Sequence, residues 1–351
     1  DFIKEAAIQA IHDNYTTYMA VPGYEDLRDA ICTKFKRDND LDFTRDQIVV
    51  STGAKQSIAN VVMSLINDGD EVIVPAPYWV TYVEIIKMAG GIPVIVHAGI
   101  ESDFKITSAQ FENAITDKTR MMIFSSPCNP TGSVYTKEEL EGLANVLAKY
   151  SNIVVLSDEI YEHINFTGKH YSLANFDAVK EQVVTINGVS KAFAMTGWRL
   201  GYIGAPLWVA KACTKMQGQF TSGTCGITQR AAKAAVEADP SVTHDMRAAF
   251  LKRRDLVLER LGKIEGVKTN LPPGAFYVFP DISSFFGKSG NGMNVNNASD
   301  MSLYLLETAG VAVVTGDAFG DPDCVRISYA ASEEVLTDAL NRIEKALNEL
   351  A

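Results

Sequence analysis

The sequence is short of the features that mark several protein classes. Its five cysteines are odd in number and widely spaced, with no CxxC pair, and none of its five histidines belongs to an HExxH motif. A disulfide framework and a structural zinc site are therefore not expected, and a reducing compartment such as the cytoplasm fits best. Neither a GxGxxG nor a Walker A pattern occurs, which argues against a nicotinamide dehydrogenase and a P-loop enzyme.

Long apolar runs and positive charge are also scarce. No apolar run approaches the length of a membrane span, and the formal net charge is −11. Neither nucleic acid nor a membrane is therefore an expected partner. The chain starts at Asp1 without a methionine and enters an amphipathic helix over Phe2–Ile11, so we expect that a first segment is missing.

The rest of the composition is that of an ordinary globular protein. The 351 residues are 47% hydrophobic and 21% charged, which suits two domains or one large domain with an appendage. From residue 47 to residue 203, short apolar runs alternate with helical patterns. The predicted strands are Gln47–Val50, Glu71–Pro75, Pro93–His97, Arg120–Ser125, Ile153–Leu156, Val183–Ile186 and Arg199–Ile203, and the helices between them are Lys55–Ile66, Val80–Ala89 and Lys137–Lys149. This pattern predicts an α/β fold, a mostly parallel sheet covered by helices.

The pattern changes near residue 241. We predict a large domain over residues 1–242, and a bridging helix (Thr243–Leu261) with a smaller α+β domain over residues 243–351. The segment Gly287–Asn297 is rich in glycine and asparagine and predicts a mobile loop. The other predicted elements of this part are strands at Gly274–Phe279 and Val311–Val314 and helices at Met301–Thr308 and Glu333–Leu350.

The most informative stretch follows the predicted strand Val183–Ile186. Lys191 and its neighbour Ser190 lie there in a run of small residues, and Arg199 follows eight positions after the lysine. A crowded, partly apolar pocket lowers the pKa of an amine and makes it nucleophilic, and an arginine offers a fork of donors to a phosphate. A reactive amine beside a phosphate holder suits pyridoxal phosphate (PLP), an aldehyde that carries a phosphate ester. Taken alone, the stretch equally fits a surface lysine and arginine around a turn.

Two further segments fall where a strand ends, the edge at which parallel sheets bind ligands. Gly53, Ala54 and Lys55 join a strand to a helix, where small residues and free N–H groups suit a phosphate, although a plain turn has the same pattern. Asn129 lies between two prolines that hold its amide out of regular structure, or simply in a rigid loop, and Asn129–Pro130 is a candidate cis bond.

Asp158 ends a buried strand, where a carboxylate needs a partner such as a protonated pyridine nitrogen. Tyr161 could reach the same ring, while the alternative is that Asp158 caps a following helix. Trp79 follows a strand and could stack on a ring or belong to the core. Arg326, in an alternating segment, could bind a carboxylate or face solvent.

Together these segments resemble the class I/II aminotransferases, PLP enzymes of fold type I, and within them the bacterial aspartate aminotransferase group. The resemblance covers nearly the whole chain. It implies that Lys191 bonds to the cofactor aldehyde and moves the proton between Cα and C4′, and that Asp158 keeps the pyridine nitrogen protonated. It further implies that Asn129 and Tyr161 bind the ring oxygen, and that Trp79 stacks on the ring. Arg199, Gly53 and Ala54 would hold the cofactor phosphate, Ser190 would contact the cofactor, and Arg326 would bind the substrate α-carboxylate.

The resemblance also bears on assembly and substrate. Tyr18 matches a tyrosine that reaches the phosphate of the neighbouring subunit, which implies a homodimer with two shared active sites. Lys55 matches a lysine that approaches the side-chain carboxylate of dicarboxylic substrates, and it also lies near the cofactor. Two departures stand out: Gly188 replaces a phosphate-binding serine of some members, and the family's N-terminal segment with its lid is missing before Asp1.

The implied reaction is a two-step (ping-pong) transfer of the amino group from aspartate to 2-oxoglutarate. Other PLP-dependent aminotransferases of the family, acting on prephenate, aromatic amino acids or alanine, are alternatives. So is the PLP-binding effector domain of a transcriptional regulator, although such domains follow a basic helix-turn-helix segment, which the acidic balance disfavours.

Overall fold

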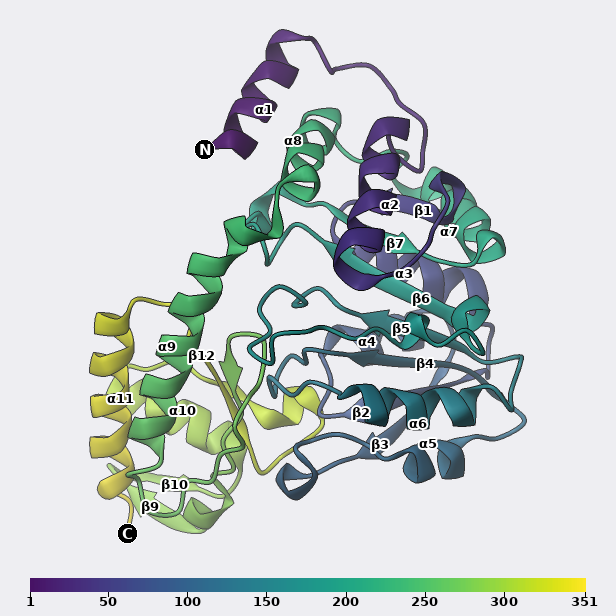
Figure 1. The fold of residues 1–351 in the computed structure, drawn as a ribbon. Coiled ribbons are helices and arrows are strands. Elements are labelled where there is room, and N and C mark those ends of the chain that lie inside the picture. The colour runs from purple at the N-terminus through teal and green to yellow at the C-terminus, as the bar shows by residue number, and fades with distance from the viewer.

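A seven-stranded sheet forms the centre of the larger part of the protein in the computed structural model, which describes residues 1–351 (Figure 1). The strands lie in the order β1-β7-β6-β5-β4-β2-β3. Only β7 is antiparallel to its neighbours, β1 and β6, so the sheet is mostly parallel, as predicted. The strands are β1 (Ile48–Ser51), β2 (Glu71–Ala76), β3 (Ile92–His97), β4 (Thr119–Ser125), β5 (Val154–Asp158), β6 (Val183–Gly188) and β7 (Gly201–Gly204).

Apolar side chains cover both faces of this sheet because helices pack on each side. One buried cluster joins the sheet to α3, α4 and α7, and a second joins it to α2, α5, α6 and α8. The central strands β5 and β6 are buried at every position, which explains why they are continuous apolar runs in the sequence. The helices are α2 (Glu25–Asn39), α3 (Ala54–Leu65), α4 (Thr81–Met88), α5 (Ser108–Ala114), α6 (Lys137–Leu147), α7 (Leu207–Phe220) and α8 (Gly226–Glu237).

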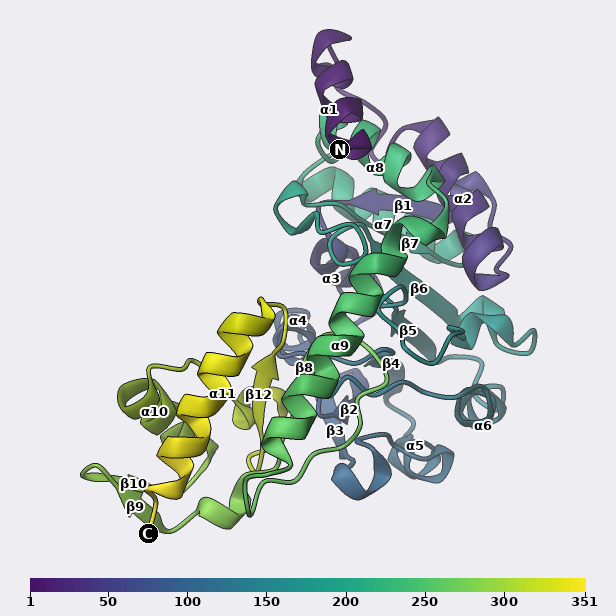
Figure 2. The ribbon, with the colours of Figure 1, turned by 60° about the vertical axis from the view of Figure 1, so that its left-hand side comes forward.

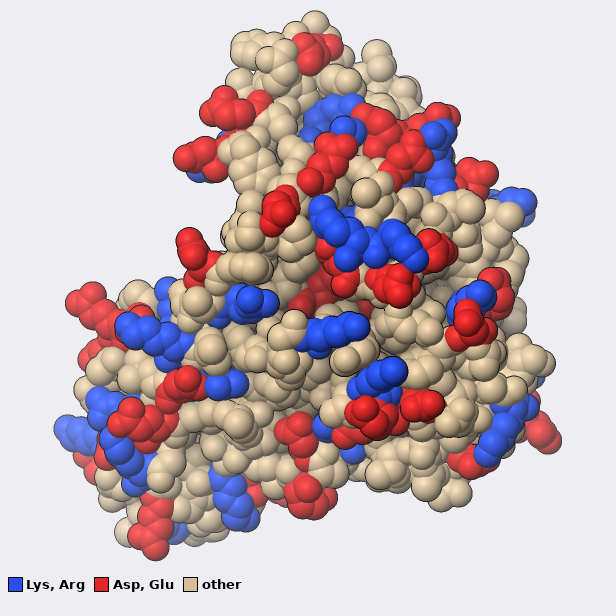
Figure 3. Space-filling view, viewed as in Figure 1, with Lys and Arg blue, Asp and Glu red and all other residues tan.

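The first helix, α1 (Phe2–His12), lies at the edge of the molecule and packs on α8 (Figures 1 and 2). None of the helices combines the length and the hydropathy needed to cross a bilayer. On the face in Figure 3, acidic and basic side chains are interspersed rather than gathered by sign.

The C-terminal part surrounds its own buried apolar cluster. The long helix α9 (His244–Leu261) runs from the region of α8 to this part, where α11 (Glu333–Asn348) packs along it (Figure 2). This part also contains a three-stranded antiparallel sheet in the order β11-β12-β8. The remaining elements are α10 (Ala298–Ala309), β8 (Tyr277–Val278), β11 (Val314–Thr315) and β12 (Val325–Ser328). The domain boundary at residues 242–243 stays a prediction.

One prediction for this part is wrong. The segment Gly287–Asn297, predicted as a loop, contains a hairpin, β9 (Lys288–Gly290) paired with β10 (Met293–Val295). Its two-residue turn, Asn291–Gly292, has positive φ at both positions (48° and 75°). Asn-Gly is the preferred pair for such a turn because both residues tolerate the left-handed region. The glycine and asparagine content therefore marked a tight turn.

Candidate active site

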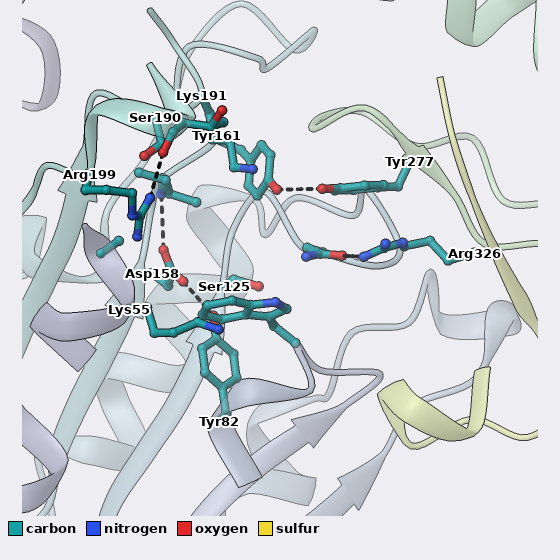
Figure 4. A pocket seen from close by; sticks show the side chains of 15 residues that line it. Lys55, Tyr82, Ser125, Asp158, Tyr161, Ser190, Lys191, Arg199, Tyr277 and Arg326 are labelled. Atoms are coloured by element: carbon teal, nitrogen blue, oxygen red, sulfur yellow. Dashed lines mark hydrogen bonds between the residues drawn. The ribbon is translucent and has the colours of Figure 1, made fainter. Parts of the chain in front are cut away.

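A pocket of about 340 Å³ opens where the large sheet's strand ends meet the small three-stranded sheet (Figure 4). It brings together residues that are far apart in the sequence and that the sequence analysis had placed in one site. Its lining residues are Ala54, Lys55, Trp79, Tyr82, Ser125, Asn129, Asp158, Ile160, Tyr161, Ser190, Lys191, Thr196, Arg199, Tyr277 and Arg326.

Lys191 lies in the turns that follow β6, and its amine points into the pocket (Figure 4). Its Nζ lies 5.5 Å from the ring centroids of Tyr161 and Phe276. Burial lowers the pKa of Lys191, and the positive charges of Arg326 and Arg199 lower it further, while Asp158 acts in the opposite direction. The side chain is therefore a better nucleophile than a surface lysine, and the alternative of a surface turn does not hold.

Asp158 is the last residue of β5 and is 4% exposed. Its Oδ2 accepts a hydrogen bond of 2.7 Å from the hydroxyl of Tyr82, and its Oδ1 accepts one of 3.3 Å from the backbone N–H of Ile160. Burial raises its pKa to about 6. The residues after Asp158 form turns rather than a helix, so the helix-cap alternative is wrong.

Gly53, Ala54 and Arg199 form a compact cradle at another end of the pocket. Gly53 has φ 86° and precedes the first residue of α3, Ala54, so the helix N-terminus faces this cradle. A Cβ at Gly53 would collide with the Arg199 guanidinium, and one at Gly201 would collide with the backbone of Gly53 and Ala54. Arg199 itself has φ 55° and donates a 2.8 Å hydrogen bond to the carbonyl of Thr196. This arrangement leaves guanidinium and backbone donors beside the pocket, which suits an anion.

Arg326 lies on β12 at the opposite side and points toward the pocket instead of solvent (Figure 4). Its Nη1 donates a 2.9 Å hydrogen bond to Oδ1 of Asn129, and its guanidinium carbon lies 4.7 Å from the ring centroid of Tyr277. The Asn129–Pro130 bond is cis, as the sequence indicated. Because Oδ1 of Asn129 accepts from Arg326, the amide NH₂ of Asn129 remains available as a donor.

Lys55 and Trp79 form one wall. The amine of Lys55 lies 5.0 Å from the Trp79 ring centroid, and the Trp79 ring packs edge-to-face on Tyr82. Trp79 both lines the pocket and packs against the apolar cluster on that face of the sheet. It is therefore placed to contact a ligand and is also part of the core.

Tyr18 is the one predicted site residue that lies apart from the pocket. Its side chain is 98% exposed, in the segment between α1 and α2. Its expected contact is with a second subunit, so its role stays a prediction.

The sequence did not single out four polar side chains of the pocket: Tyr82, Ser125, Thr196 and Tyr277. Tyr82 comes three residues after Trp79 in the first turn of α4, a spacing that places both on one side of the helix start. Ser125 ends β4 as Asp158 ends β5, and the two residues pair in register. Tyr277 begins β8, which lies inside the predicted strand Gly274–Phe279, but nothing in that segment indicated that its side chain enters the pocket.

Comparison with known proteins defines the class. The model of the aminotransferase class I and II family matches residues 1–343. The chain therefore belongs to the class I and II aminotransferases.

Individual relatives within this family are named for their substrates. A Petunia hybrida protein named bifunctional aspartate aminotransferase and glutamate/aspartate-prephenate aminotransferase is 47% identical over 98% of this chain and 73% of its own length. A Rickettsia felis protein named probable aspartate/prephenate aminotransferase is 46% identical over 100% of this chain and 87% of its own. The crystal structure of the Rhizobium meliloti aspartate aminotransferase superposes with a TM-score of 0.97 at 40% identity, covering 99% of this chain and 88% of the other.

Proposed function

We propose that the chain is a PLP-dependent aspartate aminotransferase, which transfers the amino group of aspartate to 2-oxoglutarate. The observation that carries this proposal is the position of Lys191 between a buried carboxylate, Asp158, and two arginines, Arg199 and Arg326, in one pocket. Its relatives at 45–47% identity carry aspartate or aspartate/prephenate aminotransferase names.

The chemistry of the pocket fits PLP in two places. The cradle of Gly53, Ala54 and Arg199 offers guanidinium and backbone donors for a phosphate, with Ser190 on the pocket wall. Asp158, buried and bonded only by Tyr82 and one backbone N–H, suits a protonated ring nitrogen. The pKa of Asp158 is raised to about 6 because its carboxylate is buried without a cationic partner. A protonated nitrogen beside it would lower that pKa.

When bound, PLP supplies an aldehyde that forms a covalent bond with an amine and a protonated ring that withdraws electrons. Lys191 would hold the aldehyde, and its amine would move the substrate proton between Cα and C4′. Asp158 would keep the ring nitrogen protonated. Asn129 and Tyr161 would donate hydrogen bonds to the ring oxygen, and Trp79 would stack on the ring.

Two cations at separate positions would recognise a dicarboxylic substrate. Arg326 is fixed by Asn129 and by the ring of Tyr277, so its free donors can bind the α-carboxylate in a forked geometry. The exposed amine of Lys55 approaches the side-chain carboxylate and can move aside for other side chains, because it is held only by the face of Trp79. The same arrangement supports prephenate as a second substrate, and relatives with aspartate/prephenate names favour that candidate over aromatic amino acids or alanine.

We also propose a homodimer in which Tyr18 of each chain completes the phosphate site of the other. The side chain of Tyr18 is 98% exposed in a single chain, so it is free to reach a second subunit. A cytoplasmic location is proposed because all five cysteines are free.

The visible absorption of the purified protein tests the proposal. We expect a band from cofactor bound to Lys191, loss of that band on addition of aspartate, and its return with 2-oxoglutarate. A protein that binds PLP but does not respond to aspartate would instead support a different donor, to be identified by testing prephenate with glutamate, aromatic amino acids and alanine.

A further inference from the structure

Tyr277 joins the two halves of the pocket, and no role was expected for it from the sequence. Its hydroxyl lies 2.8 Å from the hydroxyl of Tyr161, and its ring lies 4.7 Å from the guanidinium carbon of Arg326 (Figure 4). One side chain therefore contacts both the tyrosine on the cofactor side and the arginine on the substrate side.

The backbone around Tyr277 is fixed from two directions. The N–H of Gly274 donates to the carbonyl of Gly132, in the loop that carries Asn129, at 2.9 Å. The N–H of Ala275 donates to the carbonyl of Ile164, just after Tyr161, at 2.8 Å. A Cβ at Gly274 would lie only 2.7 Å from Pro127, which shows how closely the segments approach. The position of Tyr277 is thus set relative to both loops.

Hydrogen counting assigns the direction of the bond between the two hydroxyls. Each tyrosine hydroxyl has one hydrogen to donate. If Tyr161 donates its hydrogen to the ring oxygen of the cofactor, as the proposed function requires, it can only accept from Tyr277. Tyr277 is 6% exposed and its hydroxyl has no other bonded partner in the pocket, so donation to Tyr161 satisfies it.

We propose that Tyr277 is a positioning residue with two separable effects: its hydroxyl donates to Tyr161 and directs the Tyr161 hydrogen into the pocket, and its ring holds the Arg326 guanidinium ready for the substrate carboxylate. This inference rests on the proposed function. In a chain of hydroxyls each bond polarises the next, so Tyr277 strengthens the donor that Tyr161 presents. Tyr161 in turn stabilises negative charge on the ring oxygen, which competes with the Lys191 nitrogen for one proton.

The test is a pH titration of the visible absorption of the cofactor-loaded protein. Tyr277→Phe keeps the ring and removes the hydroxyl. The midpoint of this titration, called here the spectral pKa, is the pKa of the proton shared by the Lys191 nitrogen and the ring oxygen. We expect it to rise by roughly a few tenths to one unit, the range that one hydrogen bond can produce. Affinity for the dicarboxylate inhibitor succinate, followed by the same absorption, should change less than about twofold, because the ring still faces Arg326.

Two further variants separate the effects. In Tyr161→Phe/Tyr277→Phe the spectral pKa should equal that of Tyr161→Phe alone, because Tyr277 acts through Tyr161. Tyr277→Leu removes the ring as well, and succinate should bind roughly 3- to 30-fold more weakly than to Tyr277→Phe. Tyr304→Phe is the matched control: Tyr304 is fully buried, its hydroxyl donates to the carbonyl of Ala346 at 2.8 Å, and it does not line the pocket. Its loss should lower stability without moving the spectral pKa.

The outcomes distinguish this inference from the proposed function. If the parent protein shows an aspartate-sensitive band but Tyr277→Phe leaves the spectral pKa unchanged, or if the two tyrosine substitutions add independently, the role of Tyr277 is wrong and the proposed function stands. If the parent shows no cofactor band at all, both are wrong.

Discussion

Tyr82 donates a hydrogen bond of 2.7 Å to Oδ2 of Asp158, and both side chains are almost fully buried. Two elements that are distant in the sequence, the start of α4 and the end of β5, meet in this bond. The bond stabilises the charged form of a carboxylate that burial would otherwise keep protonated. Tyr82 is therefore expected to support the electronic role proposed for Asp158.

Replacing Tyr82 by phenylalanine tests this relationship. Removing a hydrogen bond to a charged group costs about 1.5–3 kcal/mol, so kcat/KM for aspartate should fall by roughly 10- to 100-fold. Steady-state kinetics measures the loss. Tyr135→Phe is the control, because the buried Tyr135 hydroxyl accepts only from the backbone N–H of Ile106 and lies outside the pocket. Equal activity of Tyr82→Phe and the parent would show that Tyr82 does not support the role of Asp158.

Asp158 should also give the cofactor-free protein a characteristic pH dependence. Its pKa rises from 3.8 to about 6 on folding, so between these values the folded protein binds more protons than the unfolded chain. The contribution to stability is complete below about pH 4 and is lost as pH rises through about 6, by roughly 3 kcal/mol at most. Urea unfolding of the parent and of Asp158→Asn at several pH values should show this slope only in the parent. A parent stability that rises across the window relative to the variant contradicts the assignment.

The two cations at the substrate end should have different effects on specificity. Arg326→Lys loses the forked geometry for the α-carboxylate, and kcat/KM should fall by about 100-fold for aspartate and for a monocarboxylic donor such as alanine alike. Lys55→Ala should reduce kcat/KM mainly for aspartate. Competing-substrate kinetics compares the two donors, and a Lys55→Ala variant equally impaired with both would show that the division of roles is wrong.

A substitution at Gly201 tests whether Gly53, Ala54 and Arg199 form the phosphate site. Gly201 pairs with Ser51 across β1 and β7, and a Cβ there would collide with the backbone of Gly53 and Ala54. Gly201→Ala should weaken PLP binding and cost about 1–3 kcal/mol of stability, because the backbone must move. Gly197→Ala, where a Cβ meets nothing within 4 Å, should bind PLP like the parent. Fluorescence titration of the cofactor-free proteins with PLP provides the comparison, and similar affinities for both variants would count against the cradle.

The sequence predicted the large sheet well because its strands are buried on both faces. β5 and β6 stand out as continuous apolar runs. Asp158 ends β5 and Lys191 follows β6, so the two residues meet at one edge of a parallel sheet. The family resemblance then supplied roles for residues whose own segments left alternatives open, such as Trp79 and Arg326.

Other features depend on long-range packing that a local pattern does not contain. β8 has only two residues, and Tyr277 enters the pocket because that strand pairs with β12 and because Gly274 packs against the loop carrying Asn129. The hairpin at residues 288–295 was mistaken for a loop because its strands are three residues long and half-exposed, so the two-residue turn was the only clear signal.

The most direct test of the account is to locate the cofactor on the chain. The PLP-loaded protein is reduced with borohydride, digested and analysed by mass spectrometry, with Lys191→Ala treated in parallel. We expect the added mass on Lys191 alone, and none on any lysine of the Lys191→Ala protein. Cofactor attached to Lys55 or another lysine in the parent, or none at all, would contradict the central claim that Lys191 is the reactive amine.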